Sequence, residues 1–260
     1  MSATGSETSR SACVFCGATD RKISKEHVWP KWLRTFIDAG DGSPIQHSRI
    51  RSQHGKVVER TDWAAIPIDW QVKAPCKPCN EGWMNRLEAE CRPHLIPMLR
   101  NQTVPLDASD QHSLAKWVTL KALMAQYGHP GGMQEIPADS YHRFYRSQAL
   151  PPGAQIWIGR YNGAGAWPCD YQHLPLYMTP QGEPEPSRPN ANVSAFTIGY
   201  AAFLYFGHEL EEGPVFTPDS TAREYFVPIW PSSTAVVWPP KGLIGADGID
   251  VLMRSLEVTL

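Results

Sequence analysis

The sequence predicts an α+β protein in two parts: a small N-terminal metal-bound module, followed by a larger α+β domain built on an antiparallel sheet. Three observations predict this class. Two Cys-x-x-Cys pairs, "CVFC" and "CKPC", lie in the first hundred residues. A helical pattern with a capping signal covers residues 110–128. After residue 150 the chain alternates apolar and polar residues between Pro and Gly breaks, as antiparallel strands do.

Composition and length are those of a globular protein. The chain has 260 residues, of which 42% are hydrophobic and 19% charged, enough for one large domain or two modest ones. No apolar stretch approaches the roughly 20 residues that a membrane span needs. Residues 1–11 are small and polar and lack the apolar middle of a signal peptide, so we expect a disordered tail and a cytoplasmic protein.

The charge is unevenly distributed along the chain. Residues 1–100 hold 15 Lys and Arg against 11 Asp and Glu, whereas residues 101–260 hold 9 against 15. The net charge of −2 argues against a general polyanion binder, and the basic first part weakly favours nucleic acid as a partner. We therefore expect a module over residues 12–105 and an α+β domain of unknown role over residues 106–260.

The two Cys-x-x-Cys pairs predict a structural zinc site. Four thiolates in two such knuckles can close tetrahedrally on one Zn²⁺. The long separation, residues 17–75, indicates that the metal would join distant segments of a larger module. A redox pair or chance burial is the alternative interpretation. Cys91 and Cys169 lack a partner at ligand spacing and are expected to be core or free thiols, so the predicted ligands are Cys13, Cys16, Cys76 and Cys79.

A polar pair and a helix start frame a second candidate site. "DRKISKEHVW" predicts a turn and a strand that ends at Glu26 and His27. "NEGWMNRLEAEC" predicts a helix with Asn80 in its first turn, because apolar side chains recur every four residues. Carboxylate and amide oxygens suit Mg²⁺, and a neutral His can take a proton from water. The alternative is a surface pair beside a structural zinc finger.

The motifs "CVFCG", "EHVWPKWL" and "CKPCNEGWMNRLE", in this order, resemble the HNH (His-Me finger, ββα-metal) endonucleases of the zinc-stapled subgroup, and the wording is similar to uncharacterised members from actinobacteria and their phages. The resemblance covers about residues 12–92. It implies a ββα-metal fold, His27 as general base, and a catalytic Mg²⁺ or Mn²⁺ held by Glu26 and Asn80. It also implies DNA as the substrate.

The sequence departs from the family in the segment between His27 and Asn80. Residues 28–79 contain no Asn, although the family's middle Asn orients the catalytic imidazole. A backbone carbonyl, Asp69 or Gln71 is expected to hold the ring instead. The same segment is much longer than in compact family members, and its middle is basic. It is either a phosphate-contacting loop or a solvated hairpin, and the candidate substrate contacts are Lys31, Arg49, Arg51 and Lys56.

The second half carries structure signals but no catalytic motif. Asp107 or Ser109 can cap the helix at 110–128, within which Trp117 is expected in the core. "ADSYHRFYRSQA" predicts a short helix that is either half-buried against the sheet or in contact with nucleic acid through its basic and aromatic residues.

The sequence as a whole predicts a metal-dependent HNH endonuclease that hydrolyses DNA phosphodiester bonds. Two alternatives stay open. One is a catalytically inactive zinc scaffold that binds nucleic acid, and the other is an enzyme that uses the same scaffold on a small molecule. The sequence does not decide the oligomeric state, and a dimer is compatible with it.

Overall fold

A computed structural model describes the chain in the residue ranges given at the end of this paragraph. Within residues 45–53 and 56–65 it describes the backbone but not the side chains. The predicted tail (1–11), Cys169 and Asp69 lie outside the described residues. The described ranges are 12–35, 45–53, 56–65, 70–128, 136–162, 171–179, 182–210, 222–231, 234–245, 247–249 and 251–253.

The N-terminal elements form two separate strand pairs. β1 ends at His27, as the sequence predicts, and pairs antiparallel with β4. β2 and β3, from the long basic segment, pair with each other and reach the large sheet through a short parallel contact between β2 and β7. The elements are β1 (Ile23–His27), the 3-10 helix η1 (Lys31–Thr35), β2 (Ile45–Gln53), β3 (Lys56–Ala65) and β4 (Gln71–Cys76).

The helix after β4 begins earlier and ends later than the sequence predicts. It starts as α1 (Lys77–Cys79), passes through a π-helical turn, η3 (Asn80–Met84), and continues as α2 (Asn85–Leu99). The sequence pattern predicts a helix from Asn80 to Cys91, whereas α2 continues to Leu99 with Pro93 and Pro97 inside it. A proline removes an N–H donor from a helix, but burial of Leu95 and Met98 stabilises this extension.

The predicted central helix is confirmed as α3. Its capping box joins Asp107, which accepts from the Asp110 backbone N–H at 2.9 Å, to the Asp110 carboxylate, which accepts from the Asp107 N–H at 3.0 Å. Trp117 is fully buried, as predicted. The elements of this part are β5 (Val104–Leu106), α3 (Ala108–Ala125), the 3-10 helix η4 (Gln126–Gly128) and α4 (Ala138–Ser147).

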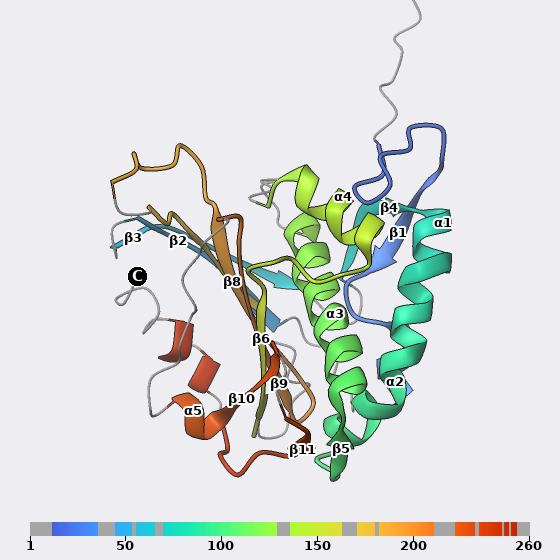
Figure 1. Ribbon diagram of the computed structural model, residues 1–260, viewed down its shortest axis with the longest axis vertical. Helices are drawn as coiled ribbons and strands as arrows, with labels where there is room; N and C mark the ends of the chain where they lie inside the picture. Colours follow the sequence, from blue (N-terminus) through green and yellow to red (C-terminus); the bar gives the residue numbers. More distant parts are fainter. Residues whose placement is uncertain are drawn as a thin grey trace, which may run out of the picture.

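A seven-stranded sheet of order β10-β6-β9-β8-β7-β2-β3 forms the other side of the protein, and its neighbours are antiparallel except for β2 and β7. Figure 1 shows α3 lying between this sheet and α2. A two-stranded pair of β5 and β11 lies at the lower end. The elements are β6 (Gln155–Arg160), β7 (Tyr171–Leu176), β8 (Ala191–Ile198), β9 (Ala201–His208), α5 (Ala222–Tyr225), β10 (Phe226–Trp230) and β11 (Val236–Trp238).

The central strands of the large sheet are buried on both faces. In β9, Phe203 and Tyr205 belong to the core shared with the helices, whereas Leu204 and Phe206 belong to a second core beneath the C-terminal segment. Side chains alternate between the faces of a strand, so a strand covered on both sides reads as a continuous apolar run. The architecture is therefore α+β with antiparallel pairing, as predicted. Among the described residues, no helix is both long and apolar enough to cross a membrane.

Candidate metal centre and the adjoining polar cluster

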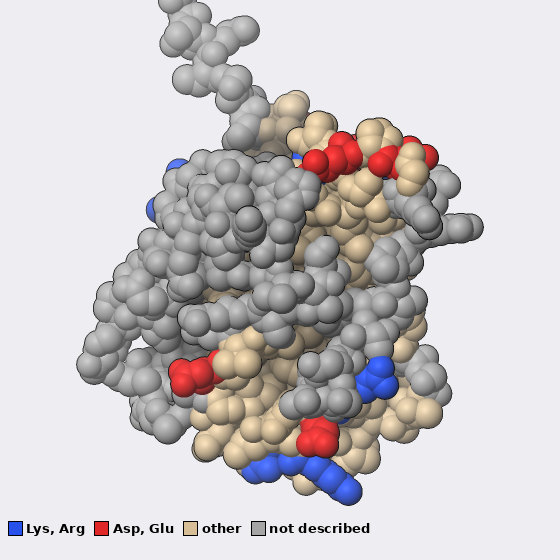
Figure 2. Space-filling view, turned by 90° about the vertical axis from the view of Figure 1, so that its left-hand side faces the viewer, with Lys and Arg blue, Asp and Glu red and all other residues tan. Residues whose placement is uncertain are grey.

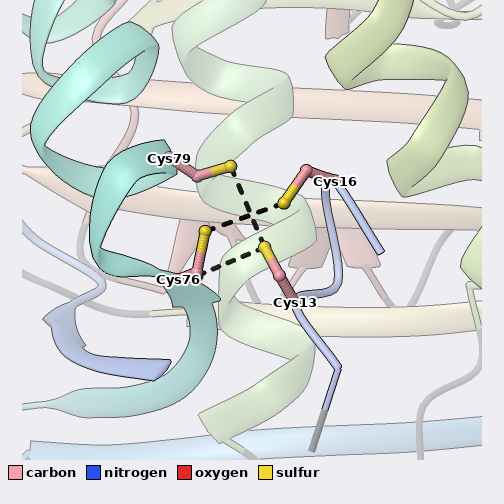
Figure 3. A group of neighbouring side chains, drawn as sticks. All are labelled: Cys13, Cys16, Cys76 and Cys79. Carbon is pink, nitrogen blue, oxygen red and sulfur yellow. Dashed lines mark hydrogen bonds between the residues drawn. The ribbon is translucent and has the colours of Figure 1, made fainter. Parts of the chain in front are cut away.

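Four cysteines from two distant segments come together at the end of β4. The Sγ atoms of Cys13 and Cys79 lie 3.8 Å apart, and those of Cys16 and Cys76 lie 3.7 Å apart. All four sulfurs lie within 4.8 Å of one another and point into one space (Figure 3). A tetrahedral zinc with Zn–S bonds of about 2.3 Å separates its sulfurs by about 3.8 Å, so the cluster can hold a zinc ion.

The local sequence explains how each knuckle turns. Gly17 has a φ of +72° and its N–H donates to the Cys13 carbonyl oxygen at 2.8 Å, which closes the first knuckle in a conformation that favours glycine. The second knuckle spans a strand end and a helix start: Cys76 is the extended N-cap and Cys79 lies in the first turn. The Cys76 N–H also donates to Cys13 Sγ at 3.2 Å, which ties the knuckles together.

Burial and hydrogen bonding shift the pKa values of the Cys13, Cys76 and Cys79 thiols in different directions. Burial opposes ionisation of Cys13, but hydrogen bonds from backbone N–H groups outweigh it and lower its pKa to about 7. Burial raises the pKa of the Cys76 and Cys79 thiols. The sulfur distances are far longer than the about 2.05 Å of a disulfide. Cys91 is a free thiol in the core, as predicted.

Glu26 and Asn80, the two predicted oxygen ligands, lie together next to the cysteine cluster. The Asn80 side chain lies close enough to Glu26 to lower its carboxyl pKa by hydrogen bonding, and Asn80 Nδ2 donates to the Ser24 hydroxyl at 3.4 Å. Glu26 is half-buried, and burial is the main reason that its pKa is raised above the usual carboxyl value. The end of β1 and the start of the following helix thus bring a carboxylate and an amide into contact.

His27 makes a different contact. It faces Gln71 across the β1–β4 pair, and its Nε2 lies 2.9 Å from the Gln71 side-chain nitrogen. This confirms one of the ring partners that the sequence suggested in place of the missing Asn. Glu26, the residue before His27, pairs with Val72. Successive side chains of a strand leave it on opposite faces, so Glu26 and His27 start from opposite faces of the β1–β4 pair.

A buried ion pair that the sequence did not predict adjoins Glu26. Lys121 of α3 is 1% exposed, and its Nζ lies 2.5 Å from the Glu88 carboxylate on α2. Among the charges around Glu26, Lys121 lowers its carboxyl pKa, Glu88 raises it, and Lys31 lowers it. The side chain of Lys121 also lies over the Trp117 ring at 5.6 Å. Two features of the sequence indicated that these charges could be buried: Lys121 lies on the apolar face of its helix, and Glu88 lies one turn from Met84. Neither feature identifies the two residues as partners.

The remaining predicted contacts are only partly described. Lys31 is exposed at the start of η1 and close enough to Glu26 to influence its pKa. Arg49, Arg51 and Lys56 lie on the β2–β3 hairpin, whose side chains are not described. Their role in substrate binding stays a prediction.

Comparisons with protein-family models, with curated proteins and with solved structures find no match to this chain.

Proposed function

We propose that this protein is a metal-dependent phosphodiesterase of the HNH type that cuts DNA. The observation that carries the proposal is the contact between Glu26, at the end of a strand, and Asn80, at the start of the helix that follows the second cysteine knuckle. The adjoining Glu26–His27 pair and the order of motifs add the chemistry that the HNH resemblance implies.

The residues would divide the work as follows. Glu26 and Asn80 would hold Mg²⁺ or Mn²⁺, for which oxygen ligands are the usual donors. The ion would act as a Lewis acid on the phosphate and stabilise the leaving oxygen. His27 would accept a proton from the attacking water. Gln71 would fix the imidazole: when it turns its amide oxygen to Nε2–H, the neutral ring keeps Nδ1 as the proton acceptor.

A basic notch beside the cysteine cluster supports nucleic acid as the partner. It has a volume of about 480 Å³ and is lined by Arg21, Arg86 and Arg146 together with Tyr145 and Trp83. Guanidinium groups bind phosphate oxygens, and aromatic rings can stack on bases. On the face in Figure 2, the described Lys and Arg residues lie in small separate groups, and so do the described Asp and Glu residues.

The experiment that tests cleavage compares His27→Ala with the wild type on supercoiled plasmid, with and without added Mg²⁺ or Mn²⁺. Loss of a general base is expected to slow cleavage roughly 10²- to 10⁴-fold. Zinc content and thermal unfolding are expected to stay unchanged. His94→Gln is the matched control, because His94 pairs with Asp110 at 3.1 Å, away from the proposed site. Equal cleavage by wild type and His27→Ala would remove the catalytic role of His27.

One observation favours the second candidate, a zinc scaffold that binds nucleic acid without cutting it. The ammonium of Lys121 lies close enough to Glu26 to lower its pKa, and a fixed positive charge there opposes a divalent cation. Manganese binding measured by electron paramagnetic resonance separates the candidates. A phosphodiesterase would bind Mn²⁺ in the wild type and lose it in Glu26→Gln. In an inactive scaffold, Glu26→Gln would leave Mn²⁺ binding unchanged.

A further inference from the structure

A cavity in the second half of the protein lies apart from the proposed catalytic residues. Its volume is about 500 Å³, within the range of small-molecule sites. It is enclosed by α4, by the turn at 149–152, and by the start of β8 and the end of β9. None of Glu26, His27 or Asn80 lines it, so it does not serve a small-molecule reaction at those residues. The inner walls are apolar, with Leu123, Ile136, Phe144 and Leu150 among them.

A few polar groups interrupt these apolar walls. The side chain of Tyr205 is 3% exposed, and its hydroxyl makes no hydrogen bond within the described part of the chain. Gly207, which pairs with Asn192, leaves room beside this hydroxyl, because a Cβ at Gly207 would approach it to 2.2 Å. Asn192 and His208 also line the cavity, and each has a buried atom, Oδ1 and Nδ1 respectively, that lacks a partner among the described residues.

The mouth of the cavity is cationic. Arg143 and Arg146 line both the cavity and an adjoining notch of about 390 Å³, which Arg188 also lines. Glu209 lies between two of the arginines, 3.8 Å from Arg143 and 3.5 Å from Arg188, and accepts from the Ser140 hydroxyl at 3.0 Å. Glu209 thus orients two guanidinium groups. Asp139 also lines the notch, so three arginines face two carboxylates and one positive charge is left in excess where the apolar chamber opens.

We propose that this cavity binds a nucleotide, with the heterocyclic base in the apolar chamber and the phosphate at Arg143, Arg146 and Arg188. A hydrocarbon chain would leave the Tyr205 hydroxyl and the Asn192 amide without partners. A free sugar would meet too little polar surface, and an inorganic anion would leave the chamber empty. A base is planar and largely apolar, carries donors and acceptors on its edge, and brings its own phosphate.

The inference stands apart from DNA cleavage, since none of Glu26, His27 and Asn80 lines the cavity. Arg146 lines both this cavity and the basic notch beside the cysteine cluster. The nucleotide could come from two sources, a free nucleotide or a base turned out of a strand, and both present the same chemistry to the cavity.

Isothermal titration of the intact protein with the four deoxynucleoside 5′-monophosphates and their nucleosides tests the proposal. For a ligand of this size, a dissociation constant of roughly tens of micromolar is expected for the preferred base. The matching nucleoside should bind at least about tenfold more weakly, because it lacks the charge-assisted contacts. Binding of none of the monophosphates below millimolar concentration would overturn the proposal.

Three variants locate the site. Arg143→Gln should weaken the nucleotide about tenfold without affecting the nucleoside, because it removes one charged contact. Tyr205→Phe should weaken both, and should leave the unfolding temperature unchanged because the hydroxyl has no hydrogen-bond partner among the described residues. Arg100→Gln, at an exposed arginine after α2, is the control and should bind as the wild type does. Nucleotide binding that is equal in all three variants would also overturn the proposal.

A competition experiment identifies the source. A single-stranded oligonucleotide that displaces the bound monophosphate, while the same strand with an abasic site does not, assigns a base from a strand. Displacement by neither strand assigns the free nucleotide. Displacement by both places the contact on the backbone alone and overturns the base-binding chamber. Running the same titration on His27→Ala separates this result from the fate of the cleavage proposal, because that variant should bind nucleotide normally.

Discussion

The β1–β4 pair and the seven-stranded sheet are held together in different ways. β4 buries Val72 and Ala74 on one face and exposes Gln71 and Lys73 on the other, so the pair has little apolar surface of its own to bury. The central strands of the large sheet, β8 and β9, bury both faces. Because two isolated strands are only marginally stable in water, the small pair depends on groups outside it. Val72 and Ala74 pack into the core shared with α3 and the large sheet, and a metal at the cysteine cluster would add a cross-link.

This difference shows where each region's stability is encoded. The candidate cross-link of the small region requires four residues of one type at fixed spacing, and few substitutions are compatible with it. The large sheet depends on an alternation of apolar side chains, for which many sequences suffice. α3 joins the two regions: Trp117 contacts Phe196 and Phe203 of the sheet, while Lys121 pairs with Glu88 on α2.

The largest effect is expected from Cys76→Ser. It removes one of four zinc ligands, so bound zinc should fall from about one ion per chain to near zero, and soluble yield should fall with it. Atomic absorption on purified protein, with a thermal melt, measures both. Cys91→Ala is the control, because Cys91 is equally buried but lies outside the cluster. If Cys76→Ser kept a full complement of zinc, the cluster would not be the metal site.

Phe203→Ala in β9 is expected to lower the stability of the protein without loss of zinc, and its effect should be smaller than that of Cys76→Ser. The ring is fully buried, and its centroid lies 5.0 Å from the ring centroid of Phe196 and 5.6 Å from that of Trp117, so its removal leaves a cavity. The free energy of unfolding should fall by about 4 kcal/mol, as measured by urea denaturation, while zinc content stays at the wild-type level. Tyr200→Ala, at an exposed ring next to the same strand, should change it by less than about 0.5 kcal/mol. Loss of zinc in Phe203→Ala would show that the two regions are not independently held.

The sequence predicted the features that depend on local chemistry. The four cysteines, the strand that ends at His27, the cap at Asp107 and the burial of Trp117 are each signalled within a few residues of the position concerned. Gln71 as the partner of His27 was one of three options, and only the strand register selects it.

The sequence did not predict the features that depend on distant partners. α2 continues through Pro93 and Pro97 because Leu95, Met98 and Leu99 at its far end are buried in the core. This packing depends on other parts of the chain, so the local helix pattern does not predict it. β2 reaches the large sheet through a parallel contact with β7, more than a hundred residues away. The burial of Lys121 depends on Glu88, which lies on another helix, so the position of Lys121 on the apolar face of its own helix did not indicate which residue would pair with it.

Lys121→Met tests the link between the two regions and should have the smallest effect of the three. The methionine fills a similar volume, but the Glu88 carboxylate, 15% exposed, loses its partner close to Glu26. Removing one member of a buried pair should cost roughly 3 kcal/mol at neutral pH, and adding Glu88→Leu should restore most of that. Lys121 lowers the carboxyl pKa of Glu26, so without it that pKa rises further above its usual value.

A carboxyl group whose pKa is raised by folding destabilises the folded state when ionised and ceases to do so as it takes up a proton. The deficit of Lys121→Met should therefore be largest at neutral pH and shrink as the pH falls toward 5. Urea denaturation at several pH values measures this, with the double variant as the reference, since it keeps Glu26 but lacks the Glu88 charge. A single variant as stable as the wild type at neutral pH would mean that the ion pair contributes no net stability. α3 would then join the two regions through apolar packing alone.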